Sequence, residues 1–342
     1  MTQTVFVTGA SGFIAKHILV KLLNAGFDVV GSVRRLDRVD EICNAVRPHL
    51  NGPVDLSAKL RFVALDLAKD DGWAAALQGA DVLMHTASPF PMSQPKDEDD
   101  IVRPAVDGAL RALKAAQAAG IKRVVMTSST VSIMSKDLAP GQTEFTEADW
   151  SDTNHPTINP YGKSKTLAER AAWDFITNHA PDMELTVINP GFVLGTPLDK
   201  HFGTSIKVIK RLLDATDPML PQFGFPIVDV SDVAEMHVRA LTHDDTAGKR
   251  FIAANGFLWF YEVAEILKAA HPDRKIITRR APNFVVRILS WFDKSIKTIV
   301  PILGRAEGVS NARAREVMQM EFTSPEDAVR ASGAYLIDNG LV

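Results

Sequence analysis

Thr4-Val-Phe-Val-Thr-Gly-Ala-Ser-Gly-Phe-Ile-Ala-Lys-His-Ile-Leu-Val-Lys-Leu-Leu23 opens the chain and decides its fold. A short apolar run with β propensity, residues 5–7, leads into Gly9 and Gly12. Apolar residues then recur at helical spacing, at Ile14, Ile18, Leu19, Leu22 and Leu23. The stretch predicts a strand, a tight glycine turn and a helix whose positive N-terminal end faces a phosphate near residues 9–14.

The glycine spacing differs from the usual dinucleotide fingerprint. The sequence reads Gly9-x-x-Gly12-x-x-Ala15 where the fingerprint reads G-x-G-x-x-G. Alanine is accepted at the third position, so this departure is mild. A glycine-rich turn of this kind also occurs in α/β proteins that bind no nucleotide, and the motif therefore needs support from the rest of the chain.

Composition narrows the class of protein. The 342 residues exceed a usual single-core domain, which predicts one large α/β domain with a smaller appendage. The net charge of -3 gives no electrostatic reason to expect nucleic acid or an anionic membrane, so we expect a small-molecule partner. Cys43 is the only cysteine, which excludes an intrachain disulfide. The first strand begins too close to Met1 for a signal peptide, and we expect a cytoplasmic protein.

Strand and helix patterns alternate beyond the first unit. Strands are predicted at residues 27–33, 60–65, 81–86 and 123–127, and a long helix at 101–119. This order predicts a doubly wound parallel sheet of the α/β class, the Rossmann type, which binds ligands at the carboxyl ends of its strands.

Polar residues follow two of these strands. Asp66, Thr86 and Ser88 become candidates for adenine and ribose contacts because they stand at strand ends. His85 ends an apolar strand and has no other metal-binding residue at ligand spacing. We therefore expect His85 to be a hydrogen-bonded core histidine, and we expect no metal site.

The second predicted strand ends in arginine. Arg34, Arg35 and Arg38 follow it, and no acid occurs from residue 29 to residue 36. An acid here would bind the ribose 2′-hydroxyl of NAD, whereas an arginine accommodates the 2′-phosphate of NADP. The sequence thus favours NADP(H), with a solvated basic loop as the alternative.

Tyr161 and Lys165 lie in the stretch Asn159-Pro-Tyr-Gly-Lys-Ser-Lys165, which begins a predicted helix. Proline suits a first helical turn, and residues four apart share one helix face. A nearby ammonium favours the phenolate and lowers the pKa of a tyrosine, which suits it to acid–base catalysis. The same pair also occurs by chance on ordinary helices.

Together these motifs resemble those of the extended short-chain dehydrogenases/reductases. The residues that carry the resemblance are Thr8-Gly9-x-x-Gly12-x-x-Ala15, the serines after Arg123-Val-Val-Met-Thr, and Tyr161-x-x-x-Lys165. Within that superfamily the chain is most similar to the dihydroflavonol 4-reductase, cinnamoyl-CoA reductase and NADPH-dependent aldehyde reductase group. That similarity rests on Val33-Arg-Arg35, His85-Thr-Ala-Ser-Pro-Phe90, Pro104-Ala-Val-Asp-Gly108, Asn189-Pro-Gly191 and Val228-Asp-Val-Ser-Asp-Val-Ala234.

The resemblance implies roles for individual residues. Ser129 would hydrogen-bond the substrate carbonyl, with Ser128 as the alternative, Tyr161 would donate the proton, and Lys165 would lower the pKa of the tyrosine and hold the nicotinamide ribose. The residues implied to contact NADP(H) are Gly9, Ser11, Gly12, Phe13, Ile14, Arg34, Asp66, Leu67, Thr86, Ser88, Tyr161, Lys165, Pro190, Gly191 and Val193. Asp107 stands where many members carry asparagine, and we assign it no catalytic role.

The same resemblance implies two interleaved domains. Residues 1–191 plus about 228–255 would bind the dinucleotide, and residues 192–227 plus 256–342 would bind the substrate. Aromatic and Met residues that could line an apolar pocket there, or simply pack in the core, are Phe90, Met92, Phe192, Phe202, Met219, Phe223 and Phe225. The apolar segment 284–303 is interrupted by charges, so we expect it to cover the pocket or the core rather than span a membrane. An interfacial or dimer-forming helix is the alternative.

The sequence therefore predicts NADPH-dependent reduction of an aldehyde or ketone, dihydroflavonol-like, aryl or aliphatic, to the alcohol. A hydroxysteroid-type dehydrogenase or a sugar-nucleotide epimerase of the same superfamily is the first alternative. A non-catalytic NADP-sensing regulator is the second, although a sensor would not need Ser129, Tyr161 and Lys165. We expect a monomer or homodimer with a small carbonyl compound as its partner.

Overall fold

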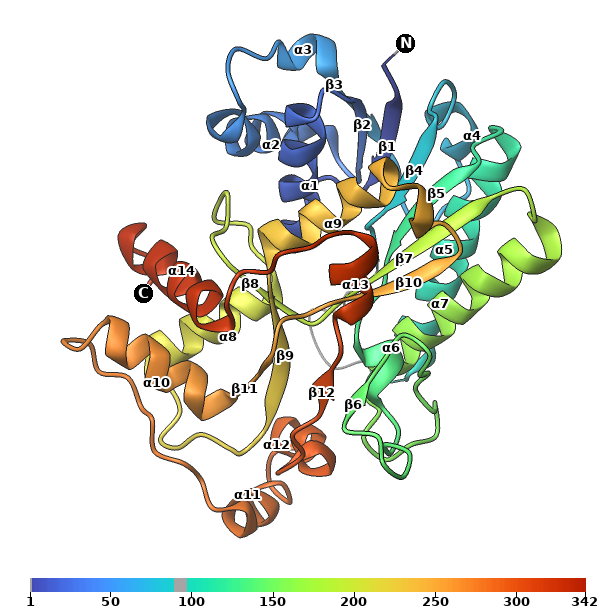
Figure 1. Ribbon diagram of the computed structural model, residues 1–342. Coiled ribbons are helices and arrows are strands. Elements are labelled where there is room, and N and C mark those ends of the chain that lie inside the picture. The colour runs from blue at the N-terminus through green and yellow to red at the C-terminus, as the bar shows by residue number, and fades with distance from the viewer. Residues whose placement is uncertain (1, 89–96) are drawn as a thin grey trace.

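A seven-stranded parallel sheet forms the centre of the protein in the computed structural model, which describes residues 2–88 and 97–342 (Figure 1). The strand order is β10-β7-β5-β4-β1-β2-β3, and every neighbouring pair is parallel. The strands are β1 (Thr4–Thr8), β2 (Asp28–Val33), β3 (Leu60–Ala64), β4 (Val82–His85), β5 (Arg123–Thr127), β7 (Glu184–Pro190) and β10 (Lys249–Ala253). The predicted doubly wound parallel sheet is thereby confirmed, with its chain reversal between β1 and β4.

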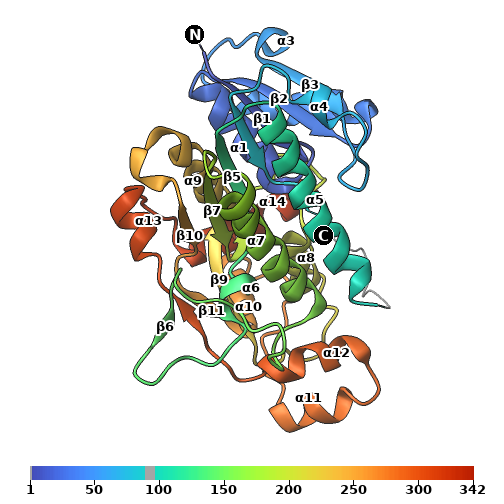
Figure 2. The same ribbon diagram turned by 90° about the vertical axis from the view of Figure 1, so that its right-hand side faces the viewer.

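Helices cover both faces of this sheet, as Figures 1 and 2 show. On one face lie α1 (Phe13–Asn24) and α9 (Val230–Thr242), and on the other α4 (Trp73–Ala76), α5 (Asp99–Ala118) and α7 (Pro160–His179). Alternate residues of β1 separate the two cores, since Val5 and Val7 pack with α1 whereas Phe6 packs with α5. The apolar run of β1 is therefore buried on both sides, as a parallel strand requires.

The remaining elements surround this sheet. Between the glycine turn and α7 lie η1 (Leu36–Arg38), α2 (Val39–Val46), η2 (Arg47–His49), α3 (Leu56–Lys59), α6 (Val131–Met134) and β6 (Glu144–Phe145). The later elements are β8 (Phe192–Leu194), α8 (Thr204–Leu213), β9 (Gly224–Asp229), η3 (Asp244–Thr246), β11 (Phe257–Trp259), α10 (Phe260–Ala270), α11 (Asn283–Leu289), α12 (Lys294–Ile299), η4 (Val300–Ile302), β12 (Gly308–Val309), α13 (Ala312–Val317) and α14 (Pro325–Asp338). Strands β8, β9 and β11 form a second small sheet, and β6 pairs with β12. The proposed division into two domains stays a prediction.

The segment 284–303 differs from its predicted role. It contains the short helices α11 and α12 and the turn η4. Val286 of α11 contributes to a small buried cluster with Ala281 and Leu303. The side chains of Phe284, Trp291 and Phe292 are instead 66%, 81% and 84% exposed. The expectation that this segment covers the core is wrong for these rings, because an apolar periodicity marks one face of a helix but does not say what lies against it. Within the described residues, no helix is long and apolar enough to cross a membrane.

Gly195 allows β8 to approach β9 closely. Its φ is +105°, and a Cβ atom there would lie 2.4 Å from Asp229 Oδ2. We expect Gly195→Ala to lower the free energy of unfolding by about 3 kcal/mol, from backbone strain and overpacking together. Gly248→Ala is the matched control, since Gly248 also has a positive φ, of +70°, but has nothing within 4 Å of its added Cβ. If urea unfolding showed the same loss of unfolding free energy in both variants, the contact with Asp229 would not be the cause.

Candidate active site

The glycine turn between β1 and α1 leads into a helix N-terminus that suits an anion. Gly9 has a φ of +68°, and a Cβ there would lie 3.0 Å from the Cβ of Ala87. Gly12 caps α1 without any side-chain hydrogen bond, and the first turn of α1 contains no acid. Among the described residues, none compensates the first N–H groups and positive end of this helix with a side-chain cap or an acid in its first turn, which fits the diphosphate of a dinucleotide.

Thr8 and His85 fix the neighbouring strand end. Thr8 Oγ1 lies 3.0 Å from His85 Nδ1 and accepts N–H bonds from Thr86 and Ala87, each 3.0 Å long. Burial, and secondarily the charge of Lys165, lowers the pKa of His85 to about 3, so the ring is neutral at pH 7. His85 is thus the hydrogen-bonded core histidine that the sequence predicts. The described residues contain no group of side chains that could hold a metal ion.

The arginines after β2 differ in their partners. Arg35 pairs with Asp37, and Arg38 pairs with Glu41. Arg34 is exposed and makes no hydrogen bond or ion pair with the rest of the described chain. It directly follows β2, beside the glycine turn, where Ala10 N donates to Ser32 O over 2.9 Å. Of the three arginines, Arg34 is the one whose guanidinium is available to a phosphate.

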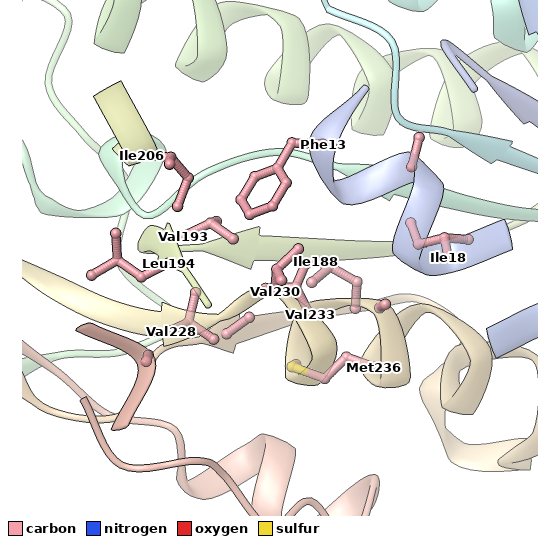
Figure 3. Close-up of a cluster of buried hydrophobic side chains, with 14 of the residues drawn as sticks. Phe13, Ile18, Ile188, Val193, Leu194, Ile206, Val228, Val230, Val233 and Met236 are labelled. Carbon is pink, nitrogen blue, oxygen red and sulfur yellow. The ribbon is translucent and has the colours of Figure 1, made fainter. Parts of the chain in front are cut away.

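The other predicted cofactor residues fall into two groups. Ser11, Ile14, Asp66, Leu67, Thr86 and Ser88 are all partly accessible. Leu67 packs over Gly108 of α5, where a Cβ would lie 2.5 Å from Leu67 Cγ. By contrast, the side chains of Phe13 and Val193 are buried in the core, and Figure 3 shows Phe13 pointing toward Val193. These two residues can reach a cofactor only through their backbone atoms.

Gly191, between β7 and β8, is also held by the backbone. Its N–H donates to Ala253 O over 3.0 Å, and a Cβ there would lie 2.3 Å from Pro226 O. Only glycine therefore fits between β7 and β9 at this point. Pro190 precedes it as the last residue of β7, and its carbonyl accepts a hydrogen bond of 3.3 Å from Ser129 Oγ.

Ser129, Tyr161 and Lys165 meet at the carboxyl end of β5. Asn159 caps α7 by accepting the N–H of Gly162 over 2.8 Å, and Pro160 occupies the first turn, as predicted. Tyr161 hydrogen-bonds with Ser129. Lys165 Nζ, one helical turn further, lies 3.5 Å from the carbonyl oxygen of Thr127. The structure thus brings the three predicted catalytic residues together.

The neighbouring serine faces away from this group. Ser128 Oγ donates to Glu169 Oε2 over 2.5 Å in the buried interior. Of the two serines left open by the sequence, Ser129 is therefore the one beside Tyr161. Asp107 is exposed on α5 and has no hydrogen bond with the described residues, in keeping with its lack of an assigned role.

The pKa values differ from the expectation for a tyrosine–lysine pair. Burial raises the pKa of Tyr161 to about 12, and the hydrogen bond with Ser129 acts in the opposite direction. Burial also lowers the pKa of Lys165 to about 8, which the charge of Glu169 partly offsets. The expected lowering of the Tyr161 pKa by Lys165 is thus wrong for this structure, in which burial of the phenol raises the pKa and the hydrogen bond with Ser129 is what opposes it. At neutral pH Tyr161 holds its proton.

The side chains predicted to line an apolar pocket fall into separate groups in the structure. Phe192 stacks on Phe225 with ring centroids 4.4 Å apart, and Phe223 meets Phe225 edge to face at 5.2 Å. These rings and Phe202 are partly buried against the main core, whereas Met219 belongs to the cluster near α11. Phe90 and Met92 lie outside the described residues. A substrate pocket formed by this group stays a prediction.

Three buried polar residues near the site were not singled out from the sequence. Glu169 and Arg250 form an ion pair behind Ser128, and His237 Nε2 lies 2.7 Å from Thr127 Oγ1. Glu169 could have been noticed, because it lies four residues after Lys165 and therefore on the same face of α7. Arg250 and His237 come from distant elements, and no local pattern connects them with the site.

The chain is similar to known reductases in sequence and in fold. The chain is 35% identical over 291 residues to the ketoreductase azaE of Aspergillus niger, covering 80% of this chain and 84% of the relative. It is 33% identical over 279 residues to cinnamoyl-CoA reductase 1 of Arabidopsis thaliana, covering 81% and 77%. The crystal structure of Gre2 from Candida albicans in complex with NADPH superposes with a TM-score of 0.80 at 28% identity, covering 98% and 99%.

The family match extends over most of the chain. Residues 5–254 match the NAD dependent epimerase/dehydratase family. This range contains the glycine turn and the group formed by Ser129, Tyr161 and Lys165. The predicted resemblance to the extended short-chain dehydrogenases/reductases, near cinnamoyl-CoA reductase, is confirmed. The chain belongs to the NAD dependent epimerase/dehydratase family.

Proposed function

We propose that this protein is an NADPH-dependent carbonyl reductase that converts an aldehyde or ketone into the alcohol. The observation that carries the proposal is the meeting of Ser129, Tyr161 and Lys165 at one strand end, on the sheet edge that also bears the glycine turn. Two relatives, a ketoreductase and a cinnamoyl-CoA reductase, support it by their names. The NADPH complex of Candida Gre2 supports the cofactor.

The chain offers a distinct surface to each part of the cofactor. The backbone of Gly9, Ser11, Gly12, Phe13 and Ile14 would hold the diphosphate at the start of α1. Arg34 would bind the 2′-phosphate, and the strand-end residues Asp66, Leu67, Thr86 and Ser88 would contact the adenosine half. Pro190, Gly191 and the backbone of Val193 would lie along the nicotinamide. NADPH, when bound, supplies the hydride.

The proton would come from Tyr161. Its raised pKa keeps the phenol protonated at neutral pH, which is the form that a reduction needs. The Ser129 hydroxyl would donate a hydrogen bond to the substrate oxygen, while the ammonium of Lys165 would stabilise the phenolate left after proton transfer and hold the nicotinamide ribose. Oxidation of an alcohol would use the same groups in reverse.

The proposed substrate class rests on the apolar side chains of the segments proposed to bind the substrate. In these segments Phe192 stacks on Phe225, and Phe223 meets Phe225 edge to face. Such a group favours aryl or aliphatic carbonyl compounds over sugar nucleotides, which need many polar contacts. We therefore infer a small, largely apolar carbonyl compound as the partner.

The proposal is tested by following NADPH absorbance with aromatic aldehydes, α-dicarbonyls, β-keto esters and dihydroflavonols. Net NADPH consumption with formation of the alcohol is the expected result, with NADH as the comparison cofactor. Tight NADPH binding without turnover of any carbonyl would contradict the proposal and favour a sensor. Product formation without net cofactor consumption would point to an epimerase.

Arg34 allows a separate test of cofactor choice. We expect Arg34→Ser to raise KM for NADPH about 10- to 100-fold, because a hydrogen-bonded charge pair contributes about 1.5–3 kcal/mol. KM for NADH should stay within about twofold, because NADH lacks the phosphate. Arg35→Ser is the matched control, since Arg35 already pairs with Asp37. An equal change for both cofactors would show that Arg34 does not read the phosphate.

A further inference from the structure

Glu169 is a fully buried carboxylate with both oxygens engaged. It lies on α7 and has no exposed surface. Oε1 accepts from Arg250 Nε over 2.5 Å. Oε2 accepts from Ser128 Oγ over 2.5 Å, Ser132 Oγ over 2.7 Å and Asn189 Nδ2 over 2.8 Å. A buried charge with this many donors is fixed in position.

Arg250 is fixed equally well from the other side. It comes from β10, and its Nη1 donates to the carbonyl oxygens of Glu147 and Asp149 over 3.0 Å and 2.7 Å. The guanidinium carbon lies 3.8 Å from the centroid of the Trp150 ring. The ion pair therefore joins α7, β10 and the segment before α7 into one rigid unit.

The donors around Glu169 are also the supports of Ser129. Ser128 directly precedes it in the chain, and Ser132 Oγ lies 2.7 Å from Ser129 O. Asn189 Nδ2 lies 3.3 Å from Ser129 O, and the next residue, Pro190, accepts from Ser129 Oγ. The backbone that carries Ser129 is thus held by groups that are themselves held by Glu169.

Glu169 also supplies the negative charge that acts on Lys165, one helical turn away. The other titratable groups around Lys165 are Tyr161 on α7, His85 from β4 and, through Thr127, His237 from α9. Burial lowers the pKa of His85 to about 3 and that of His237 to about 4, so both are neutral at pH 7. Arg250 is the positive charge paired with Glu169 in this network. Asp107 on neighbouring α5 is exposed, so solvent screens its charge.

We propose that Glu169, held by Arg250, is a positioning residue of the active site, which fixes Ser129 through Ser128, Ser132 and Asn189. The charge of Glu169 also acts on Lys165 along the same helix face. The proposal rests on the proposed carbonyl reduction. Glu169 touches neither substrate nor cofactor in this scheme, and acts only through the residues that do. Stability alone is a poor reason for such a pair, because well-packed apolar residues usually replace a buried ion pair without loss.

The first test is Glu169→Gln, which keeps the shape of the side chain and removes its charge. We expect kcat to fall about tenfold or more, because small displacements of catalytic groups are costly, while KM for NADPH stays within about twofold. The alkaline limb of the kcat/KM pH profile should move about one unit toward lower pH, because the pKa of Lys165 falls further without a neighbouring negative charge. Asp174→Asn is the control, an exposed acid on the same helix.

Glu169→Gln could lose activity because it misfolds, and two further variants distinguish this from a loss of positioning. Ser128→Ala leaves every charge in place and removes one hydrogen bond beside Ser129, and should lower kcat without moving the alkaline limb. The double variant Glu169→Gln, Arg250→Met leaves no unpaired buried charge and should therefore fold. It should still show the low kcat and the shifted alkaline limb expected for Glu169→Gln. Wild-type kcat in both variants, or an unshifted alkaline limb in the double variant, would overturn the positioning role. Absence of turnover in the wild-type protein would instead overturn the proposed function.

Discussion

Tyr161→Phe is expected to reduce kcat for carbonyl reduction by about 10²- to 10⁴-fold, the range that a general acid contributes. Phenylalanine keeps the ring that packs at the start of α7 but has no proton to give. The raised pKa of Tyr161, about 12, means that nearly every wild-type molecule carries this proton at neutral pH. The loss should therefore appear in kcat across the whole neutral range and not only at high pH.

Binding of NADPH separates this result from misfolding. Tyr161→Phe should bind NADPH within about threefold of the wild-type affinity, because the glycine turn and Arg34 are untouched. Tyr261→Phe is the matched control, since it removes the hydroxyl of a buried tyrosine in α10 whose ring lies under Arg280. Full activity of Tyr161→Phe would exclude it as the proton donor and would also remove the main support for the proposed function.

Much of the fold could be predicted from local patterns. The apolar run of β1, the two glycines and the helical spacing after them determine a strand, turn and helix that need little tertiary information. The same holds for α7, where Asn159 and Pro160 mark the start of the helix and Tyr161 and Lys165 share its face. These local signals also indicated Tyr161 and Lys165 as a catalytic pair, whereas the role of Ser129 was implied by the family resemblance. The strand order then brings β5 and α7 together.

What could not be predicted depends on contacts between distant segments. Arg250 meets Glu169 across 81 positions of sequence, and nothing in the residues around Arg250 indicates its partner. The pKa of Tyr161 was expected to fall because the sequence shows the ammonium of Lys165 but not the desolvation of the phenol. In the segment 284–303 the sequence likewise shows apolar residues but not that Trp291 and Phe292 are exposed.

Lys165→Met is expected to lower kcat/KM by about 10²-fold or more without destabilising the protein. Burial lowers the pKa of Lys165 from 10.5 to about 8, so the folded state binds this proton less tightly than the unfolded state. The charged side chain therefore opposes folding. This cost is fully present below pH 8 and disappears as the pH rises past the unfolded value of 10.5. Methionine has a similar length and removes the cost.

Stability and activity should consequently change in opposite directions in Lys165→Met. In urea unfolding near pH 7, Lys165→Met should be at least as stable as the wild type, whereas its activity is lost. The wild-type kcat/KM should fall above about pH 8, where Lys165 loses its charge, and the variant should lack this limb. Lys163→Met is the matched control, because its ammonium forms a surface ion pair of 2.6 Å with Glu98, and such pairs contribute at most about 1 kcal/mol. A Lys165→Met protein that unfolds more easily than this control would show that the lysine is kept for stability. A stable but inactive protein would show that the reaction requires the buried charge, which the chain retains at the expense of stability.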